Sequence, residues 1–287
     1  APFFAKREYL FYIGPAFIVT FILMFLPLFQ IIVGSMHKWE FGKPLFESNF
    51  VGLKNYIELN YGYVSFGKSL MKTSIFGFGS LAIELCLGLL IAILLSNMRR
   101  TKGLFSAIFI IPIVIMPAMV GLTWKMYLSY DGLVNWVLSL FYIPKVNWMG
   151  TDLALVSLIL VDVWQWTPFM VLIFIAGLRS LPKEPFESAM IDGARPFQVF
   201  RRLTFPMMHK VIAVAILIRG IDLWRIVDYV FVLTAGGPGT ATYTLSYYSW
   251  QRFTFVQWGY GATISLFSLI AILIIGNAFI YFAKVKW

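Results

Sequence analysis

Residues 10–33 read LFYIGPAFIVTFILMFLPLFQIIV and contain no charged side chain. A helix needs about 20 predominantly apolar residues to cross the hydrocarbon core of a bilayer. Five further runs have similar length, and three of the six runs carry ionisable residues. The runs cover residues 10–33, 73–95, 103–123, 153–178, 211–233 and 261–283. The sequence therefore predicts an all-α integral membrane protein with six transmembrane helices, organised as one transmembrane domain over residues 1–287.

The composition supports a membrane protein. Hydrophobic residues make up 60% of the chain and charged residues 13%, whereas soluble domains average roughly 45–50% and about 25%. The first run is too long for a signal-peptide core, and no small-x-small cleavage site follows it. We therefore expect it to remain as a helix.

Lys and Arg are unevenly distributed between the predicted spans. With the N-terminus inside, they make up about one residue in four of the inner segments and about one in twelve of the outer loops. Arg99, Arg100 and Lys102 form a short basic stretch between the second and third spans. The net charge of +10 thus marks a cytoplasmic face that meets lipid rather than nucleic acid. We expect a multi-pass protein of a bacterial-type cytoplasmic membrane, with both termini cytoplasmic.

Few residues are suited to metal binding or covalent chemistry. Cys86 is the single cysteine, and His37 and His209 are the only histidines. An intrachain disulfide is impossible, and a Cys/His metal site is not expected. No nucleophile and base occur at credible spacing, so we expect neither a metal site nor enzymatic activity.

The segment Gly62–Ser69 matches the phosphate-loop pattern G-x-x-x-x-G-K-S. Such a loop follows a buried strand and belongs to a soluble sheet. Here the preceding segment is polar, Tyr63 and Phe66 crowd the loop, and the charge bias places it outside, away from ATP. We therefore expect no nucleotide site here and place any ATPase on another chain.

The long inner loop, residues 181–206, predicts two short helices joined by a sharp bend. Pro185 suits a first helical turn, with Glu184 at the positive end of the helix dipole. Asp192 and Gly193 then supply a stop, since glycine tolerates a left-handed conformation. Pro196 begins the second helix, which we expect to continue through Leu203.

The first of these helices has an apolar face suited to a protein partner. Phe186, Ala189 and Met190 share that face, and Glu187 lies at its edge. The alternative is an amphipathic segment lying among lipid head groups, which the arginines of the second helix would favour.

A pattern within the loop resembles one found in a known family. Its residues are Glu187, Ser188, Ala189, Asp192, Gly193, Ala194, Phe200 and Pro206. This pattern is similar to the EAA loop of ABC-importer permeases, through which the membrane subunit meets its ATPase. Ser188 stands where the family usually has alanine, and its side chain is also small. The resemblance implies that the residues from Glu187 to Phe200 couple this chain to an ATPase.

The resemblance extends along nearly the whole chain. The segments 50–56, 164–170 and 233–238 are similar to carbohydrate-importer permeases, most of all to the maltose- and glycerol-phosphate-type first permease subunit. The family implies a second permease subunit, two cytoplasmic ATPase subunits that bind ATP and Mg²⁺, and an extracytoplasmic solute-binding protein. It implies no cofactor on this chain.

Ionisable residues inside the apolar runs indicate function or helix pairing, because a charge at the bilayer centre costs at least about 2.5–3.5 kcal/mol. They are Glu84, Asp162, Arg219, Asp222, Arg225 and Asp228. We expect Glu84 to be an interhelical partner rather than a ligand.

Helical spacing places several of these groups in two stripes near mid-depth. The stripes are Asp162, Trp166 and Phe169 on the fourth span, and Arg219, Asp222 and Ile226 on the fifth. One interpretation makes them the walls of a solute path, with aromatic faces on sugar rings and polar groups on hydroxyls. Family resemblance favours it. The alternative pairs Arg219 with Asp222, and Arg225 with Asp228, as structural ion pairs.

We therefore expect a permease subunit of a binding-protein-dependent ABC importer that forms half of a path for a sugar or oligosaccharide. Arg219 is compatible with an acidic sugar, whereas Asp162 and Asp222 suit a neutral polyol, so the charge of the solute stays open. The rival function is an ion-coupled secondary transporter of a polar solute, in which the intramembrane carboxylates relay protons or sodium.

Overall fold

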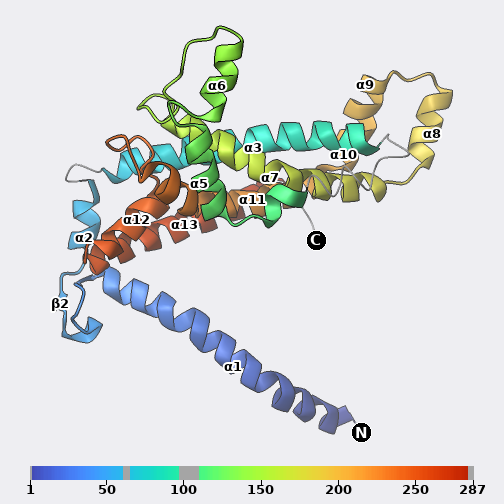
Figure 1. The fold of residues 1–287 in the computed structure, drawn as a ribbon. Helices are drawn as coiled ribbons and strands as arrows, with labels where there is room; N and C mark the ends of the chain where they lie inside the picture. Colours follow the sequence, from blue (N-terminus) through green and yellow to red (C-terminus); the bar gives the residue numbers. More distant parts are fainter. Residues whose placement is uncertain (1, 61–64, 97–109, 284–287) are drawn as a thin grey trace. The chain divides into compact units, whose positions relative to one another are not determined.

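The computed structural model describes residues 2–60, 65–96 and 110–283, and it is mostly helical (Figure 1). The long helices are α1 Pro2–Ser35, α3 Phe66–Ser96, α7 Ala154–Arg179, α11 His209–Trp224 and α13 Trp258–Phe282. The shorter ones are α2 Lys54–Ile57, α5 Pro117–Tyr127, α6 Leu133–Leu140, α8 Glu184–Ile191, α9 Pro196–Val199, α10 Phe205–Met207 and α12 Leu245–Thr254. Single turns are η1 Leu45–Glu47 and η2 Glu58–Asn60, of 3-10 type, and η3 Phe200–Thr204 and η4 Val230–Thr234, of π type. The strands β1 His37–Lys38 and β2 Asn49–Phe50 form a small antiparallel hairpin.

The described residues include four helices that are long and apolar enough to cross a membrane: Tyr12–Ser35, Phe66–Ser96, Ala154–Arg179 and Trp258–Phe282. A fifth is added if Pro196–Met207 and His209–Trp224, bent by 64°, form one span. A mostly helical membrane protein is thus confirmed. The expected third span, 103–123, lies partly outside the described residues, as does the basic stretch Arg99 to Lys102.

Two of the expected spans are interrupted, which corrects the prediction of six continuous helices. The third is broken at Ile115 and Met116 before α5 begins at Pro117. The fifth, expected over residues 211–233, stops at Trp224 and resumes beyond a break at residues 225–227. A count of apolar residues cannot detect such breaks, because side chains from other elements satisfy the backbone groups that they expose.

Side chains from other elements donate hydrogen bonds to backbone carbonyls at the second break and beyond it. The hydroxyl of Ser246 donates to the carbonyl of Trp224 at 2.8 Å, where α11 ends. The Lys125 Nζ donates to the carbonyl of Val232 in η4 at 3.1 Å. Because unsatisfied carbonyls are expensive at membrane depth, the Ser246 contact stabilises the interruption, and the Lys125 contact stabilises η4 beyond it.

The loop between α7 and α11 folds as its proline and glycine residues predict. Helix α8 begins at Glu184 with Pro185 in its first turn, and Gly193 follows it with φ +69°. The amide of Ala194 donates to the carbonyl of Ala189 at 2.9 Å and closes the helix end. Pro196 begins α9, and helical turns continue past Leu203 through η3 and α10.

The structure also bears on the phosphate-loop match. Residues 61–64 lie outside the described residues, and Gly67 to Ser69 lie in the first turns of α3. The element before them is the 3-10 turn η2, not the strand that a phosphate loop requires. This supports rejecting a nucleotide site there.

The chain divides into two compact units, each described by itself. The first unit comprises Ala1–Phe66 and Tyr248–Ile270, and the second comprises Gly67–Tyr247 and Ala271–Trp287. In the first unit, the side-chain amide of Asn55 donates to the carbonyls of Ser35 and His37 at 2.8 and 3.0 Å. The amide of Gly259, at the start of α13, donates to the carbonyl of Trp39 at 2.9 Å. The hairpin is therefore attached to helical segments on both sides of it in sequence.

Gly259 provides a test of this packing. A Cβ atom added there would lie 2.1 Å from the carbonyl oxygen of His37 and 3.0 Å from the amide nitrogen of Trp39. Since backbone must move to admit it, we expect Gly259→Ala to lower the free energy of unfolding by about 1–3 kcal/mol. Thermal unfolding of the purified protein would measure this. Gly276→Ala is the control, because a Cβ there meets nothing within 4 Å; equal melting temperatures for both variants would contradict the packing.

Candidate functional site

An arginine and two carboxylates from three helices meet inside the second unit. Arg219 on α11 donates from Nε to Glu84 Oε2 at 2.8 Å and from Nη2 to Glu84 Oε1 at 2.7 Å. Its Nη2 also donates to Asp162 Oδ2 at 2.9 Å. Glu84 lies on α3 and Asp162 on α7, and none of the three residues is more than 1% exposed. The fork of the guanidinium thus joins three long helices.

These contacts decide between the structural alternatives raised by the sequence. The prediction that Glu84 pairs between helices is confirmed, since it holds Arg219 with both oxygens. The pairing of Arg219 with Asp222, and of Arg225 with Asp228, is wrong for the described residues, because Asp222, Arg225 and Asp228 are exposed and form no ion pair there. The physical reason is that two carboxylates on neighbouring helices match the planar fork of Arg219, while α11 ends before Arg225.

Aromatic and amide groups extend the charged cluster. The Arg219 guanidinium lies 4.8 Å from the centre of the Trp166 ring, a cation–π distance. Trp166 Nε1 donates to the Tyr229 hydroxyl at 3.2 Å, and that hydroxyl donates to Gln165 Oε1. Gln165 Nε2 in turn donates to the carbonyl of Ile115 at 2.8 Å. The residues Glu84, Asp162, Arg219, Trp166, Tyr229 and Gln165 are called the buried network below.

The buried network connects the two interrupted spans. Ile115 lies at the first break, and Tyr229 lies between the second break and η4. Gln165, on the continuous helix α7 and fully buried, contacts both. Sequence reasoning missed this residue, because its role depends on backbone breaks that an apolar run does not reveal.

The structure brings some of the predicted path residues together and leaves others apart. Asp162, Trp166 and Arg219 belong to the buried network. Phe169 is half-buried beside Trp166, with ring centres 6.0 Å apart. Asp222 is exposed, and Ile226 is half-buried within the break of the fifth span. Of the six predicted path residues, therefore, Asp162 and Arg219 are buried, and the other four keep accessible surface.

A second aromatic site lies beside α7 and takes the form of a cavity. A cavity of about 570 Å³ is lined from α5, α6 and α7 by residues that include Trp124, Tyr127 and Trp164. The Trp124 and Trp164 rings lie edge to face, with centres 5.6 Å apart. Sequence reasoning missed the convergence of Trp124 and Tyr127 with Trp164.

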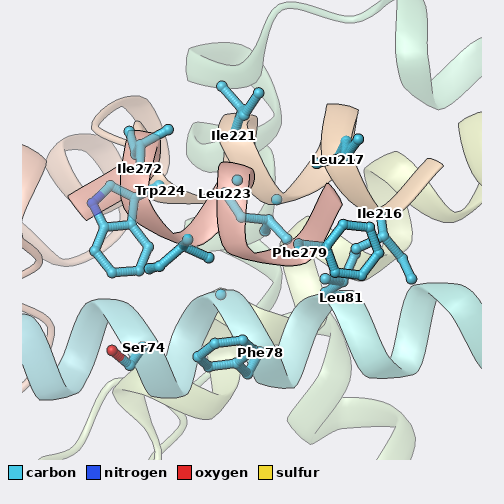
Figure 2. Close-up of a pocket in the computed structure, with 14 residues that line it drawn as sticks. Ser74, Phe78, Leu81, Ile216, Leu217, Ile221, Leu223, Trp224, Ile272 and Phe279 are labelled. Atoms are coloured by element: carbon cyan, nitrogen blue, oxygen red, sulfur yellow. The ribbon is translucent and has the colours of Figure 1, made fainter. Parts of the chain in front are cut away.

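A smaller cavity is apolar, unlike the buried network. It measures about 120 Å³ and lies between α3, α11 and the C-terminal half of α13 (Figure 2). Phe78, Leu223 and Phe279 contribute to its wall. The hydroxyl of Ser74, which also lines it, donates a hydrogen bond to the carbonyl of Leu70 within α3. With no charged residue in its lining, this cavity does not suit a polar solute.

The predicted coupling residues form an exposed surface at the end of α7 (Figure 1). No residue of α8 is buried, and Glu187, Ser188, Asp192 and Gly193 are all exposed. Ala189, Ala194 and Phe200 are half-buried. Three large apolar side chains also point outward, with Met190 69%, Ile191 87% and Phe197 71% exposed. The second helix of the loop continues through η3 and α10 to α11, which carries Arg219.

Known proteins resemble this chain along most of its length. Residues 84–284 match the sequence profile of the family described as binding-protein-dependent transport system inner membrane component. The trehalose/maltose transport system permease protein MalF of Thermococcus litoralis is 35% identical over 271 residues, which cover 94% of this chain and 90% of that protein. The probable ABC transporter permease protein y4oQ of Sinorhizobium fredii is 36% identical over 256 residues, with 86% and 82% covered.

A solved structure has the same fold. A chain from the crystal structure of a bacterial alginate ABC transporter, in complex with its alginate pentasaccharide-bound periplasmic protein, superimposes with a TM-score of 0.83. The alignment covers 97% of this chain and 95% of that chain at 20% sequence identity. The helix arrangement found here thus occurs in an assembled transporter.

Arg219 provides the test of the buried network. Arg219→Met leaves Glu84 and Asp162 buried without a counter-charge, and loss of one partner from a buried ion pair costs about 3–5 kcal/mol. We expect a much lower melting temperature, measured on purified protein, and a smaller loss for Arg219→Lys, which keeps the charge without the fork. Arg225→Met is the matched control at an exposed position. Equal melting temperatures for Arg219→Met and Arg225→Met would contradict a stabilising network.

Proposed function

The chain belongs to the family of binding-protein-dependent transport system inner membrane components, and we propose that it forms half of a translocation path for a sugar or oligosaccharide. The observation that carries the proposal is the break in the fifth span beside the buried network. Non-helical backbone at membrane depth is tolerated where it is buried in protein or lines a water-filled cavity. Interrupted spans in transporters likewise contribute to solute sites.

The groups around this break suit a sugar. Asp222, Arg225 and Asp228 are exposed close to it and offer both donors and acceptors for hydroxyl groups. Trp166 and Phe169 supply half-buried aromatic faces from α7. Asp162 and Arg219 are buried in the network that joins α7 and α11, so their role in this path is to position these two helices, while Trp166, Phe169, Asp222 and Ile226 face the solute.

The substrate class also follows from relatives. One relative described above is named as a trehalose/maltose transport system permease protein, and its match covers 94% of this chain. Aromatic faces together with a few polar groups are the usual composition of a small-molecule site. The acidic and basic groups at the break are mixed, which suits neutral sugars and sugar acids alike.

The exposed loop between α7 and α11 is proposed as the site where one of two cytoplasmic ATPase subunits of the transporter docks. Met190, Ile191 and Phe197 expose apolar surface that a partner would cover, and Glu187 adds a charge for pairing. Since α9, η3 and α10 lead into α11, movement of the loop would tilt the helix that carries Arg219. ATP and Mg²⁺ would bind the ATPase subunits.

Two further partners complete the proposed machine. A second permease subunit would supply the other half of the path, and an extracytoplasmic solute-binding protein would deliver the sugar. Both termini of this chain would then lie on the cytoplasmic side. Family membership favours this ATP-driven importer over the ion-coupled secondary transporter.

Coupling through the loop is tested by charge reversal. We expect Glu187→Lys to reduce ATP-dependent uptake in membrane vesicles strongly while the protein remains inserted, because the reversed charge repels an ATPase surface built to pair with a carboxylate. Gly193→Pro should act similarly, since proline cannot adopt the φ of +69° found there. Glu184→Lys, on the same helix and also exposed, is the matched control. Normal uptake by both Glu187→Lys and Gly193→Pro would exclude the coupling role.

The path is tested at Asp222. A hydrogen bond to a charged group contributes roughly 1.5–3 kcal/mol, so Asp222→Asn should raise the sugar concentration needed for half-maximal uptake about tenfold or more. Protein level and basal ATPase activity should not change, because Asp222 lies outside the buried network. Asp152→Asn, at an exposed position before α7, is the control. If the two variants transport equally well, Asp222 does not contact the solute.

A further inference from the structure

A large polar cavity lies in the first unit, apart from the groups discussed so far. It measures about 670 Å³, within the range of roughly 300–1,000 Å³ that is typical of small-molecule sites. Its wall combines the segment after α1, the region of α2 and the segment from the end of α12 to the start of α13. The charge bias of the sequence places all three segments on the extracytoplasmic side.

Close backbone packing builds the floor of this cavity. Gly259 approaches the hairpin so closely that its amide donates a hydrogen bond to the carbonyl of Trp39. Both residues line the cavity. The Trp39 ring is held edge to face by Trp258, with ring centres 4.9 Å apart. Tyr260 contributes a second aromatic group, and its hydroxyl donates to the carbonyl of Glu58 at 3.0 Å. The aromatic walls are thus set by the fold before any ligand arrives.

Four of the charged groups in the cavity wall are paired with one another. The Lys38 Nζ lies 3.6 Å from Glu40 Oε1, and the Lys54 Nζ lies 3.8 Å from Glu58 Oε1. Each lysine therefore has its own carboxylate, and these two pairs add no net charge to the cavity. One further cation, Arg252, lines the same cavity.

Arg252 is held in a fixed position without a carboxylate. Its guanidinium lies 5.0 Å from the centre of the Tyr248 ring and 5.3 Å from that of Tyr260. Its Nη1 donates to Gln257 Oε1 at 2.8 Å. Its Nε is buried and has no hydrogen-bond partner in the described part of the chain, where no acidic residue forms an ion pair with Arg252 either.

We propose that this cavity binds a carboxylated saccharide, with the acid group on Arg252 and the sugar ring against Trp39 or Tyr260. The Arg252 guanidinium forms no ion pair in the described part of the chain, and a planar guanidinium binds a carboxylate by donating two parallel hydrogen bonds to it. Aromatic walls and a volume of this size accommodate a sugar ring in addition to the acid group. The inference rests on the proposed transport of sugars only in selecting a sugar acid among carboxylates.

The test measures binding to the purified full-length chain in lipid nanodiscs, with galacturonate as the probe. We expect galacturonate to raise the melting temperature in a saturable manner and to change tryptophan fluorescence, because Trp39 lines the cavity. Galactose and the methyl ester of galacturonic acid, which lack the negative charge, should give no shift. A comparable shift from either neutral sugar would overturn the proposal, and so would the absence of a shift from galacturonate.

Variants and a simple anion complete the experiment. Arg252→Gln should weaken galacturonate binding at least tenfold, and Arg252→Lys should retain part of it, since lysine keeps the charge but not the fork. Acetate at the same concentration should shift the melting temperature less than galacturonate; an equal shift would show that the sugar ring contributes nothing and would overturn the assignment. If Arg252→Gln lowers the stability of the ligand-free chain, the ester comparison on the unaltered chain still decides the question.

The readout is separate from that of the proposed function. Binding is measured on the isolated chain, whereas the transport function is measured as ATP-dependent uptake in vesicles. Failure of galacturonate to bind would leave uptake of neutral sugars unaffected. Failure of uptake through the break at residues 225–227 would leave the galacturonate shift unchanged.

Discussion

The bidentate contact between Arg219 and Glu84 is the interaction on which the second unit depends, because an arginine buried to this degree is tolerated only with its charge neutralised. Asp162 completes the neutralisation from a third helix. The consequence is geometric as well as energetic, since α3, α7 and α11 must keep the distances that a planar fork allows. Trp166 covers one face of the guanidinium and restricts it further.

That rigidity allows two neighbouring spans to be interrupted. Gln165 on α7 serves the carbonyl of Ile115 at one break and the hydroxyl of Tyr229 near the other. Ser246 satisfies a carbonyl at the second break, and Lys125 satisfies one in η4 beyond it. Exposed polar side chains can therefore lie next to the non-helical backbone of residues 225–227 without destabilising the neighbouring helices. This is the combination that a polar solute needs in a membrane.

Arg219 and Arg252 differ in a way that relates to function. Arg219 receives both of its carboxylates from the chain itself and is closed to other partners. Arg252 is fixed by tyrosine rings and a glutamine, with a buried donor left over. The first arrangement stabilises helix packing, whereas the second is pre-organised for an acid group from outside.

The sequence by itself determined those features that depend on neighbouring residues. Uninterrupted apolar runs predicted α1, α3, α7 and α13, and Pro185, Gly193 and Pro196 predicted the turns of the loop that follows α7. Glu84 was recognised as a helix partner because a lone carboxylate in an apolar run needs one. Only the tertiary structure decided that its partner is Arg219, that the fifth span breaks after Trp224, and that no acidic residue of the described segments pairs with Arg252. The physical reason is that charge pairing and the capping of broken helices join residues far apart in the chain, for which local patterns carry no information.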